Sequence, residues 1–244
     1  MKNSNKWVLA ALLLLLGSLT AYNMGLRAEY RRGAYKNPLR DTTALAFKDF
    51  DEVDVPAAGA LNVKIVQGPF GVRLRDGAAK LVRVRQQGPR LTVTLSAPSG
   101  YVFWGSGDVL TVTCPHLTQL RTDAVYEQKG KPVTDKLNQN WGGGEHLVQV
   151  QGFTEDSLTV RQDHASHVEL AHNQIGYLRA TSGPGPGSLS VLRVAASNRI
   201  GAANFDVRHQ SELVLGSAIP RLRYQFADSA KATFSGSALG QLRP

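Results

Sequence analysis

The feature of this chain that most constrains its fold is a series of very short apolar–polar–apolar segments separated by Gly, Asn, Asp and Ser. A segment of this length cannot bury an apolar face by itself, so it must stack on neighbours of the same kind. The series is clearest in residues 158–160, 168–170, 178–180, 189–191, 205–207, 213–215 and 222–226. Together with the alternation that begins near Phe47, it predicts an all-β domain.

The spacing of the segments predicts how the strands stack. A β-sandwich favours strands of about five to six residues, whereas these segments are shorter. Three pairs of apolar residues recur after 19 to 21 residues: Leu158 and Leu178, Val168 and Leu189, and Leu213 and Ala232. This interval is typical of one turn of a parallel β-coil with two or three strands per turn. The sequence therefore predicts a parallel β-helix, or β-solenoid, instead of a sandwich.

The amino terminus is apolar and flanked by basic residues. Residues 7–26 include only Asn23 as a strongly polar side chain, and a stretch of about 20 such residues can span a bilayer. The uninterrupted apolar run at 7–16 has the length of a signal-peptide core. Cleavage after Ala21 would place bulky Leu19 where a small residue is preferred. We therefore favour an uncleaved transmembrane anchor, with a cleaved signal as the alternative.

The net charge of +9 is unevenly distributed. Residues 1–40 hold seven basic residues and one acidic residue, a net +6, whereas residues 41–244 hold 21 basic and 18 acidic residues, a net +3. Nucleic-acid-binding proteins concentrate positive charge on a folded face, but here most of it flanks the apolar segment, as expected near a membrane surface. We expect a membrane partner through residues 7–26 and no nucleic-acid partner.

Two arguments on membrane orientation disagree. The flank after the apolar segment is more basic than the flank before it, and the positive-inside rule would then place the domain in the cytoplasm. A β domain behind one amino-terminal apolar segment is, however, the usual layout of an exported protein. We expect a membrane-anchored chain with its domain in the periplasm or outside the cell. A cytoplasm-facing, membrane-tethered scaffold is the alternative.

These observations predict three parts of the chain. Residues 1–26 form the anchor or signal, residues 27–45 a basic juxtamembrane linker, and residues 46–244 the β domain. A polar, glycine-rich stretch near 128–145 is expected to leave the β domain as an insertion.

Several segments of the β domain resemble a known family. They lie at 47–55, 61–68, 81–84, 91–95 and 109–120, and they are similar to the bacterial family of unknown function called putative auto-transporter adhesin, head GIN domain. The likeness covers residues 47–240, although the chain departs from the family pattern after Leu120. The resemblance implies a right-handed parallel β-helix and brings no catalytic residues.

Three aspartates suggest an enzymatic alternative. Asp163, Asp206 and Asp228 are 43 and 22 residues apart, close to whole turns of the predicted coil, so Asp206 and Asp228 are expected to stack. Paired carboxylates can supply the acid and base for polysaccharide cleavage. The favoured explanation is simpler: Asp suits turns because its side chain hydrogen-bonds nearby backbone.

Neither a metal site nor a reactive cysteine is expected. His164, His167 and His172 form the densest group of possible zinc ligands, but residues 164 and 167 would point to opposite faces of one strand. Cys114 is the only cysteine and alternates with Leu110 and Val112, so it is interpreted as a small buried residue. No cofactor is predicted.

Aromatic side chains beside glycines are the candidates for a ligand-binding surface. Tyr101, Trp104 and Trp141 all lie in such contexts, which suit stacking on a sugar ring or anchoring a protein partner. Packing of a tryptophan onto the β domain is the more frequent explanation. The sequence as a whole favours a non-enzymatic envelope or cell-surface module for binding or adhesion, with an envelope glycan or protein as partner.

Overall fold

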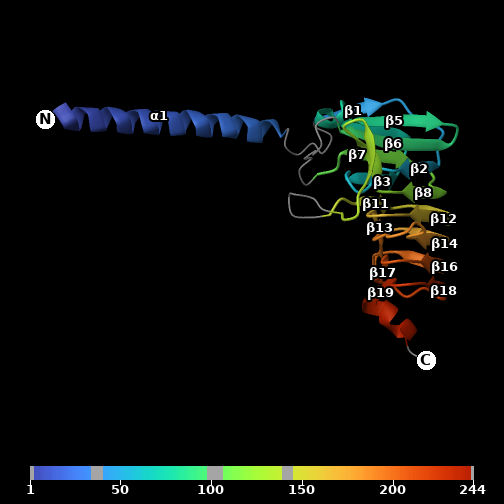
Figure 1. The fold of residues 1–244 in the computed structure, drawn as a ribbon. Helices are drawn as coiled ribbons and strands as arrows, with labels where there is room; N and C mark the ends of the chain where they lie inside the picture. The colour runs from blue at the N-terminus through green and yellow to red at the C-terminus, as the bar shows by residue number, and fades with distance from the viewer. Residues whose placement is uncertain (1–2, 34–40, 98–106, 139–144, 243–244) are drawn as a thin grey trace. The chain divides into compact units, whose positions relative to one another are not determined.

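The computed structural model describes residues 3–33, 41–97, 107–138 and 145–242 (Figure 1). The chain divides into two units, Met1–Thr42 and Thr43–Pro244. The first unit contains a long helix, and the second contains all the β-strands except the first residue of the first strand. Each unit is described by itself.

Helix α1 spans Asn3–Arg32. Its segment Asn5–Arg31 is long and apolar enough to cross a membrane, since a bilayer core of about 30 Å needs about 20 helical residues. Ser18 and Thr20 donate their hydroxyl protons to the carbonyl oxygens of Leu15 and Leu16, at 2.9 and 2.7 Å. These bonds satisfy the two hydroxyls within the helix itself and so reduce the cost of placing them in lipid. The helix therefore fits either a membrane anchor or a signal segment.

The β unit consists of two large sheets. The nine-stranded sheet contains, in spatial order, β1 (Thr42–Leu45), β4 (Gly71–Arg75), β7 (Leu110–Cys114), β3 (Val63–Gln67), β11 (Val148–Gln151), β13 (His167–Ala171), β15 (Val191–Val194), β17 (Glu212–Leu215) and β19 (Lys231–Phe234). The ten-stranded sheet contains β10 (Lys131–Thr134), β9 (Val125–Gln128), β6 (Arg90–Ala97), β2 (Glu52–Val55), β8 (Gln119–Thr122), β12 (Thr154–Gln162), β14 (Gln174–Ser182), β16 (Arg199–Val207) and β18 (Arg221–Phe226), with β5 (Val82–Gln87) paired to β6. Two short 3-10 helices, Asp76–Ala78 and Gly236–Leu242, complete the described elements.

From β11 onward the chain alternates between the two sheets, and from β13 onward each new strand pairs in parallel with the previous strand of its sheet. Leu158 pairs with Leu178 across β12 and β14, and Leu213 pairs with Ala232 across β17 and β19. Figure 1 shows β12, β14, β16 and β18 stacked in this order. Buried side chains of both sheets join one apolar core that includes Phe153 and other residues with almost no exposed surface.

The predicted right-handed parallel β-helix is wrong, although the all-β class of the domain is confirmed. The two sheets are mixed and neither closes on itself, so the arrangement is a sandwich of parallel and antiparallel pairs. Strand β4 runs antiparallel to β7, β5 to β6, and β10 to β9. The physical reason for one of these reversals is the tight turn at Gly88 and Pro89, where Gly88 adopts a φ of 57°, a conformation that favours glycine.

The predicted insertion near 128–145 is in part a regular strand. Gln128 ends β9 and Lys131 begins β10, which returns along β9 with Lys131 opposite Gln128. The first residues of the stretch therefore extend the ten-stranded sheet as a hairpin.

Candidate ligand-binding groove

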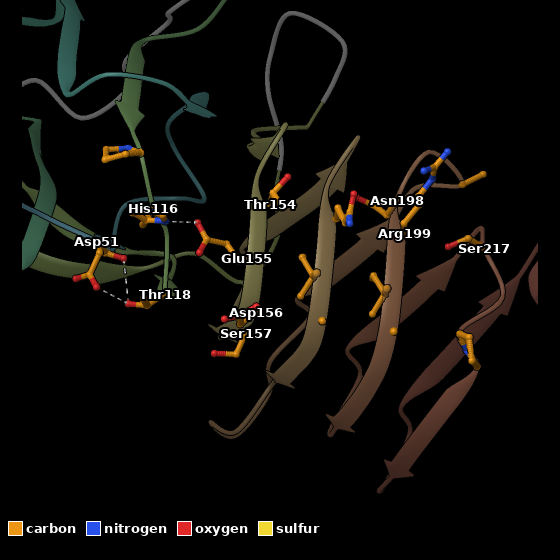
Figure 2. Close-up of a pocket in the computed structure, with 18 of the residues that line it drawn as sticks. Asp51, His116, Thr118, Thr154, Glu155, Asp156, Ser157, Asn198, Arg199 and Ser217 are labelled. Atoms are coloured by element: carbon orange, nitrogen blue, oxygen red, sulfur yellow. Dashed lines mark hydrogen bonds and ion pairs between the residues drawn. The ribbon is translucent and has the colours of Figure 1, made fainter.

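A groove with a volume of about 1200 Å³ crosses the first residues of β12, β14 and β16. Its remaining walls come from Phe70, Ser237 and residues near 49–51, 115–118, 196–198 and 217–220. Figure 2 shows these strands side by side, with Thr154 and Glu155 on β12 and Arg199 on β16. The groove thus gathers segments that are far apart in the sequence.

Two neighbouring strands bring the same motif, Asn-x-Ile-Gly, to this groove at 173–176 and 198–201. The register pairs Ile175 with Ile200, so the two motifs lie side by side. Both isoleucines are buried, at 1% and 5% exposure. They anchor the start of each strand to the core, because burying an isoleucine side chain stabilises the fold by about 1.5–3 kcal/mol.

The two glycines of the motif leave the floor of the groove without side chains, because the strand backbones approach each other closely at these positions. A Cβ atom on Gly176 would lie 2.6 Å from the carbonyl oxygen of Asp156, and one on Gly201 would lie 2.9 Å from the carbonyl oxygen of Gly176. Neither approach is open to a residue with a side chain unless the backbone moves. Glycine is the residue that permits such a close approach of two backbones.

The asparagines of the motif hold the turns that precede β14 and β16. Asn173 is 2% exposed, its Oδ1 accepts the N–H of Phe153 at 2.9 Å, and its Nδ2 donates to the carbonyl oxygen of Val150 at 3.0 Å. Its Nδ2 and backbone N–H both donate to Oδ1 of Asn198. The Nδ2 of Asn198 in turn donates to the carbonyl oxygen of Leu170 at 2.6 Å. The two amides therefore connect successive turns along one side of the groove.

One end of the groove is acidic. The Oε1 atom of Glu155 accepts the backbone N–H of Leu117 at 3.0 Å and lies 3.5 Å from Nδ1 of His116. The Oδ2 atom of Asp51 accepts the hydroxyl of Thr118 at 3.1 Å. Figure 2 shows these two linked pairs next to each other. Their carboxylate oxygens are fixed by the protein, so they form a preorganised set of hydrogen-bond acceptors.

The charge of the groove is opposite to that of the chain. Asp49, Asp51, Glu155 and Asp156 line it, with Arg199 as the arginine among its lining residues. Four carboxylates against one guanidinium disfavour an anionic ligand. A neutral or cationic ligand with many hydrogen-bonding groups fits better, because side-chain hydroxyls and amides accompany the charges: Thr118, Thr154, Ser157, Gln174, Asn198 and Ser217.

The groove also offers apolar surface and an unused polar group. Phe50 and Phe70 both line it, with ring centroids 5.3 Å apart and planes inclined by 57°. Phe70 is 37% exposed, so its ring is available to a ligand. The Oγ atom of Ser217 is buried and has no hydrogen-bond partner among the described residues. Such a buried polar group is costly unless water or a ligand pairs with it.

The aromatic candidates predicted from the sequence cannot be placed in this site. Tyr101, Trp104 and Trp141 lie outside the described residues. Their role in ligand binding stays a prediction.

The predicted stacking of aspartates does not occur. Asp206 lies opposite Gln225 in the register of β16 and β18, and its carboxylate accepts two hydrogen bonds from Nε of Arg208, at 2.9 and 3.1 Å. Asp163 accepts the N–H of Gly185 at 3.1 Å, and Asp228 occupies a turn with a φ of 58°. The register differs from the predicted one by a few residues, so the three carboxylates do not stack on one another.

The histidines are also separated by their local structure. The Nδ1 atom of His164 lies 2.6 Å from Asp123, whereas that of His167 lies 2.9 Å from Glu145. His172 has a φ of 57° and donates its backbone N–H to Ser197. Within the described part of the chain, no group of three or more His, Cys, Asp or Glu residues is arranged to hold a metal ion.

Cys114 is fully buried at the end of β7. Burial raises the pKa of its thiol to about 12, and the nearby carboxylates of Glu155 and Asp51 act in the same direction. Only about one thiol in ten thousand is then ionised at about pH 8. We expect a thiol-specific reagent to label Cys114 at least a hundredfold more slowly in the folded chain than in denaturant. Equal rates in both states would contradict this burial.

The sequence contained a signal for the groove that the strand pattern alone did not reveal. The Asn-x-Ile-Gly motifs are 25 residues apart, and Ser217-Ala-Ile-Pro220 follows 19 residues later in the equivalent position. Glu155 and Asp156 occupy the corresponding places on β12. A search for repeated turn motifs, instead of repeated apolar residues, would have identified these positions.

Comparison with known proteins adds distant structural similarities. No protein-family model matches the chain, and no curated protein matches its sequence. A crystal structure of a putative adhesin from Bacteroides fragilis NCTC 9343 is similar, with 14% identity and a TM-score of 0.48 over 80% of this chain and 94% of that chain. A putative adhesin from Parabacteroides merdae ATCC 43184 has 8% identity and a TM-score of 0.32, over 79% and 95% of the two chains. A putative lipid binding protein from Parabacteroides distasonis ATCC 8503 has 12% identity and a TM-score of 0.30, over 80% and 94%.

These similarities assign neither a family nor a function to the chain. Membership of the head GIN family stays a prediction, because it rests on the sequence resemblance alone. Two of the structures named above are described as putative adhesins.

Proposed function

We propose that this protein is a non-enzymatic binding module of the cell envelope whose groove takes a segment of a neutral or amine-bearing glycan. The observation that carries the proposal is the composition of the groove. Rigid carboxylates, hydroxyls, amides and an exposed phenyl ring line one continuous channel across three strands. Polyhydroxyl chains are bound by this combination, because hydrogen bonds fix the hydroxyls while an aromatic ring packs on the apolar face of a sugar.

The negative charge of the groove favours neutral or cationic envelope ligands over acidic ones. The excess of carboxylates over Arg199 opposes binding of acidic polysaccharides, and burying a phosphate or carboxylate next to them would be costly. An extended peptide with basic side chains is the alternative ligand. Selective capture of basic peptides by the chain would identify this ligand class.

The apolar helix α1 supports the proposed location. It would hold the module at a membrane as an anchor, and export would place the groove among envelope glycans. The polysaccharide-cleaving alternative has less support, because Asp206 faces Gln225 instead of a second carboxylate.

The proposal can be tested with the full chain in detergent and a panel of immobilised envelope oligosaccharides that includes neutral, amine-bearing and acidic members. Ala218 is exposed and lines the groove. The variant Ala218→Trp should therefore fill the channel without disturbing the packing of the core. We expect the wild-type chain to retain neutral or amine-bearing members and the variant to bind at least tenfold more weakly.

Ala79→Trp provides the matched control, because Ala79 is exposed and does not line the groove. It should bind as the wild type does. Retention of acidic members only, or equal binding by both variants, would refute the proposal. Release of shortened oligosaccharides would instead establish an enzyme, and selective capture of basic peptides would establish a peptide-binding groove.

A further inference from the structure

The outer face of the ten-stranded sheet carries a dense group of arginines. On β8, β12, β14 and β18 the side chains that point away from the core include Arg121, Arg161, Arg179, Arg221 and Arg223. These five residues are called the arginine face. All five alternate with residues that point toward the core, and all except Arg121 are classed as exposed.

The register spreads these arginines over two dimensions. Arg121 lies directly opposite Arg161 on the neighbouring strand. Arg179 pairs with Thr159 and Asn204, and Asn204 pairs with Arg223, so Arg179 and Arg223 share a line two strands apart. Neighbouring strands are about 4.8 Å apart. The charges therefore cover a patch of sheet instead of following one groove.

Few carboxylates compensate this charge. On the outward positions of β8, β14, β16, β18 and the second half of β12, Asp206 is the acidic residue, and it is bound by Arg208 at 2.6 Å. With Arg199 of β16, these positions hold six arginines against one carboxylate, a net charge of +5, which exceeds the +3 of residues 41–244 together. At the β2 edge of the patch, Asp54 lies opposite Arg121. Among the described residues, no carboxylate forms an ion pair with Arg161, Arg179 or Arg223.

A shallow hollow of about 440 Å³ lies within this face. Gly176 and Ala202 form its floor, and Tyr177, Arg221 and Arg223 stand around it. Small floor residues leave room for a group that the guanidinium groups can surround. Arginine is suited to phosphate because its planar fork donates two parallel hydrogen bonds to the phosphate oxygens.

We propose that the arginine face binds the anionic phospholipid headgroups of a bilayer surface and so holds the β domain against the membrane. Charge complementarity, a two-dimensional distribution and a hollow for a phosphate group all match a planar anionic surface. Each Arg or Lys near such a surface contributes about 1 kcal/mol of attraction, equivalent to about fivefold in binding.

The length of the tether strengthens this assignment. Nine residues, 33–41, separate the end of α1 from the start of β1, and at full extension they span about 30 Å. If α1 is a membrane anchor, a tether of this length keeps the β domain near the membrane and so raises the effective concentration of headgroups at its surface. A polysaccharide chain would be expected to follow a line of charge, whereas these arginines are spread over several strands.

The test uses the full chain reconstituted in vesicles, with a fluorophore attached at Asn204→Cys in the centre of the arginine face. The native Cys114 is fully buried, so the new cysteine is labelled selectively. Vesicles of phosphatidylcholine alone are compared with vesicles that also contain phosphatidylglycerol, both with a quencher on a minority of headgroups. We expect stronger quenching in the anionic vesicles, and loss of the difference in about 1 M salt, where the Debye length is about 3 Å.

Two triple variants separate the arginine face from general charge. Arg161→Gln, Arg179→Gln and Arg223→Gln together should lower the membrane-contacting population about a hundredfold. The control triple, Lys64→Gln, Arg73→Gln and Lys231→Gln, removes the same charge from the nine-stranded sheet and should leave the quenching unchanged.

Equal quenching in neutral and anionic vesicles, or an equal effect of both triple variants, would overturn the proposal. A third result would also overturn it and point to an acidic polysaccharide: a response of the label to added dextran sulfate in neutral vesicles, without any response to phosphatidylglycerol. The proposal does not depend on the glycan-binding groove, whose variants lie on other residues.

Discussion

Replacing Asn173 with alanine should lower the free energy of unfolding of the β domain by about 3–5 kcal/mol. The amide is 2% exposed and makes hydrogen bonds to the N–H of Phe153, the carbonyl oxygen of Val150 and Oδ1 of Asn198. Alanine would leave the buried N–H of Phe153 without its side-chain acceptor and would remove one donor from the carbonyl oxygen of Val150. An unsatisfied buried group costs about 1–3 kcal/mol. The lost contact to Asn198 adds to this, because that amide fixes the next turn.

The measurement is equilibrium unfolding by denaturant of the full chain in detergent, followed by circular dichroism of the β domain. Asn204→Ala is the matched control, because Asn204 is exposed on β16 and should change stability by less than about 0.5 kcal/mol. A similar small change for Asn173→Ala would show that the turns do not depend on the amide. Asn173→Asp keeps the acceptor but loses the donor, so its cost should also be substantial.

The β class of this chain could be predicted because buried positions alternate with more exposed ones along many of its strands, such as β6, β7 and β17. Leu158 and Leu178 were predicted to stack and are register partners, since identical apolar residues at a regular interval fill one layer of the core. The predicted pairing of Val168 with Leu189 is wrong, because Val168 lies opposite Leu192. The link before β15 contains two prolines, at 184 and 186, and its extra length could not be read from apolar spacing.

The topology was predicted incorrectly because the apolar triplets cover only parts of longer strands. Strands β12, β14 and β16 have nine residues each, and their polar ends are held by backbone hydrogen bonds that leave no mark on hydropathy. The amino-terminal strands, which from the sequence could either begin the coil or form a hairpin, include the hairpin of β5 and β6. Its alternation is compatible with both parallel and antiparallel pairing, and only the Gly88-Pro89 turn distinguishes them.

The groove could not be predicted from the sequence for a different reason, because its lining residues come from distant parts of the chain. Glu155 and Asp51 are 104 residues apart, and they line one site only because β8 lies between β2 and β12. The depth of the groove depends on missing atoms, the Cβ positions of Gly176 and Gly201. A pattern of hydrophobicity does not record the close approach of two backbones.

Acidification should destabilise the β domain through His146. This residue is 7% exposed, and burial lowers the pKa of its imidazole to about 4. The Nδ1 atom has no hydrogen-bond partner among the described residues. Unfolding returns the imidazole to water and to a pKa of about 6.5. Between about pH 6.5 and about pH 4, the unfolded chain therefore takes up a proton that the folded chain refuses, and stability is lost as the pH falls.

The expected loss in the free energy of unfolding follows from the lowered pKa of His146. Each pKa unit corresponds to about 1.4 kcal/mol, so this single group should cost on the order of 3 kcal/mol once the pH is below about 4. Most of that loss should be present at about pH 4.5. Local unfolding at low pH should begin near β11, because His146 immediately precedes this strand. Strand β11 lies between β3 and β13 in the nine-stranded sheet.

The variant His146→Leu isolates this contribution, because leucine fills a similar volume and cannot be protonated. At about pH 7.5 its free energy of unfolding should be within about 1 kcal/mol of that of the wild-type chain. At about pH 4.5 the variant should be more stable than the wild type by about 2–3 kcal/mol, since it escapes the proton-linked loss. The comparison at two pH values cancels the titration of the carboxylates, which both chains share.

Parallel losses in the two chains would mean that the folded state accepts a proton on His146 as readily as the unfolded state does. The imidazole would then have to be hydrated in the folded chain, and the two hydrogen bonds between the backbone of His146 and the side chain of Asn138, at 2.7 and 2.8 Å, would not be sufficient to keep water from it.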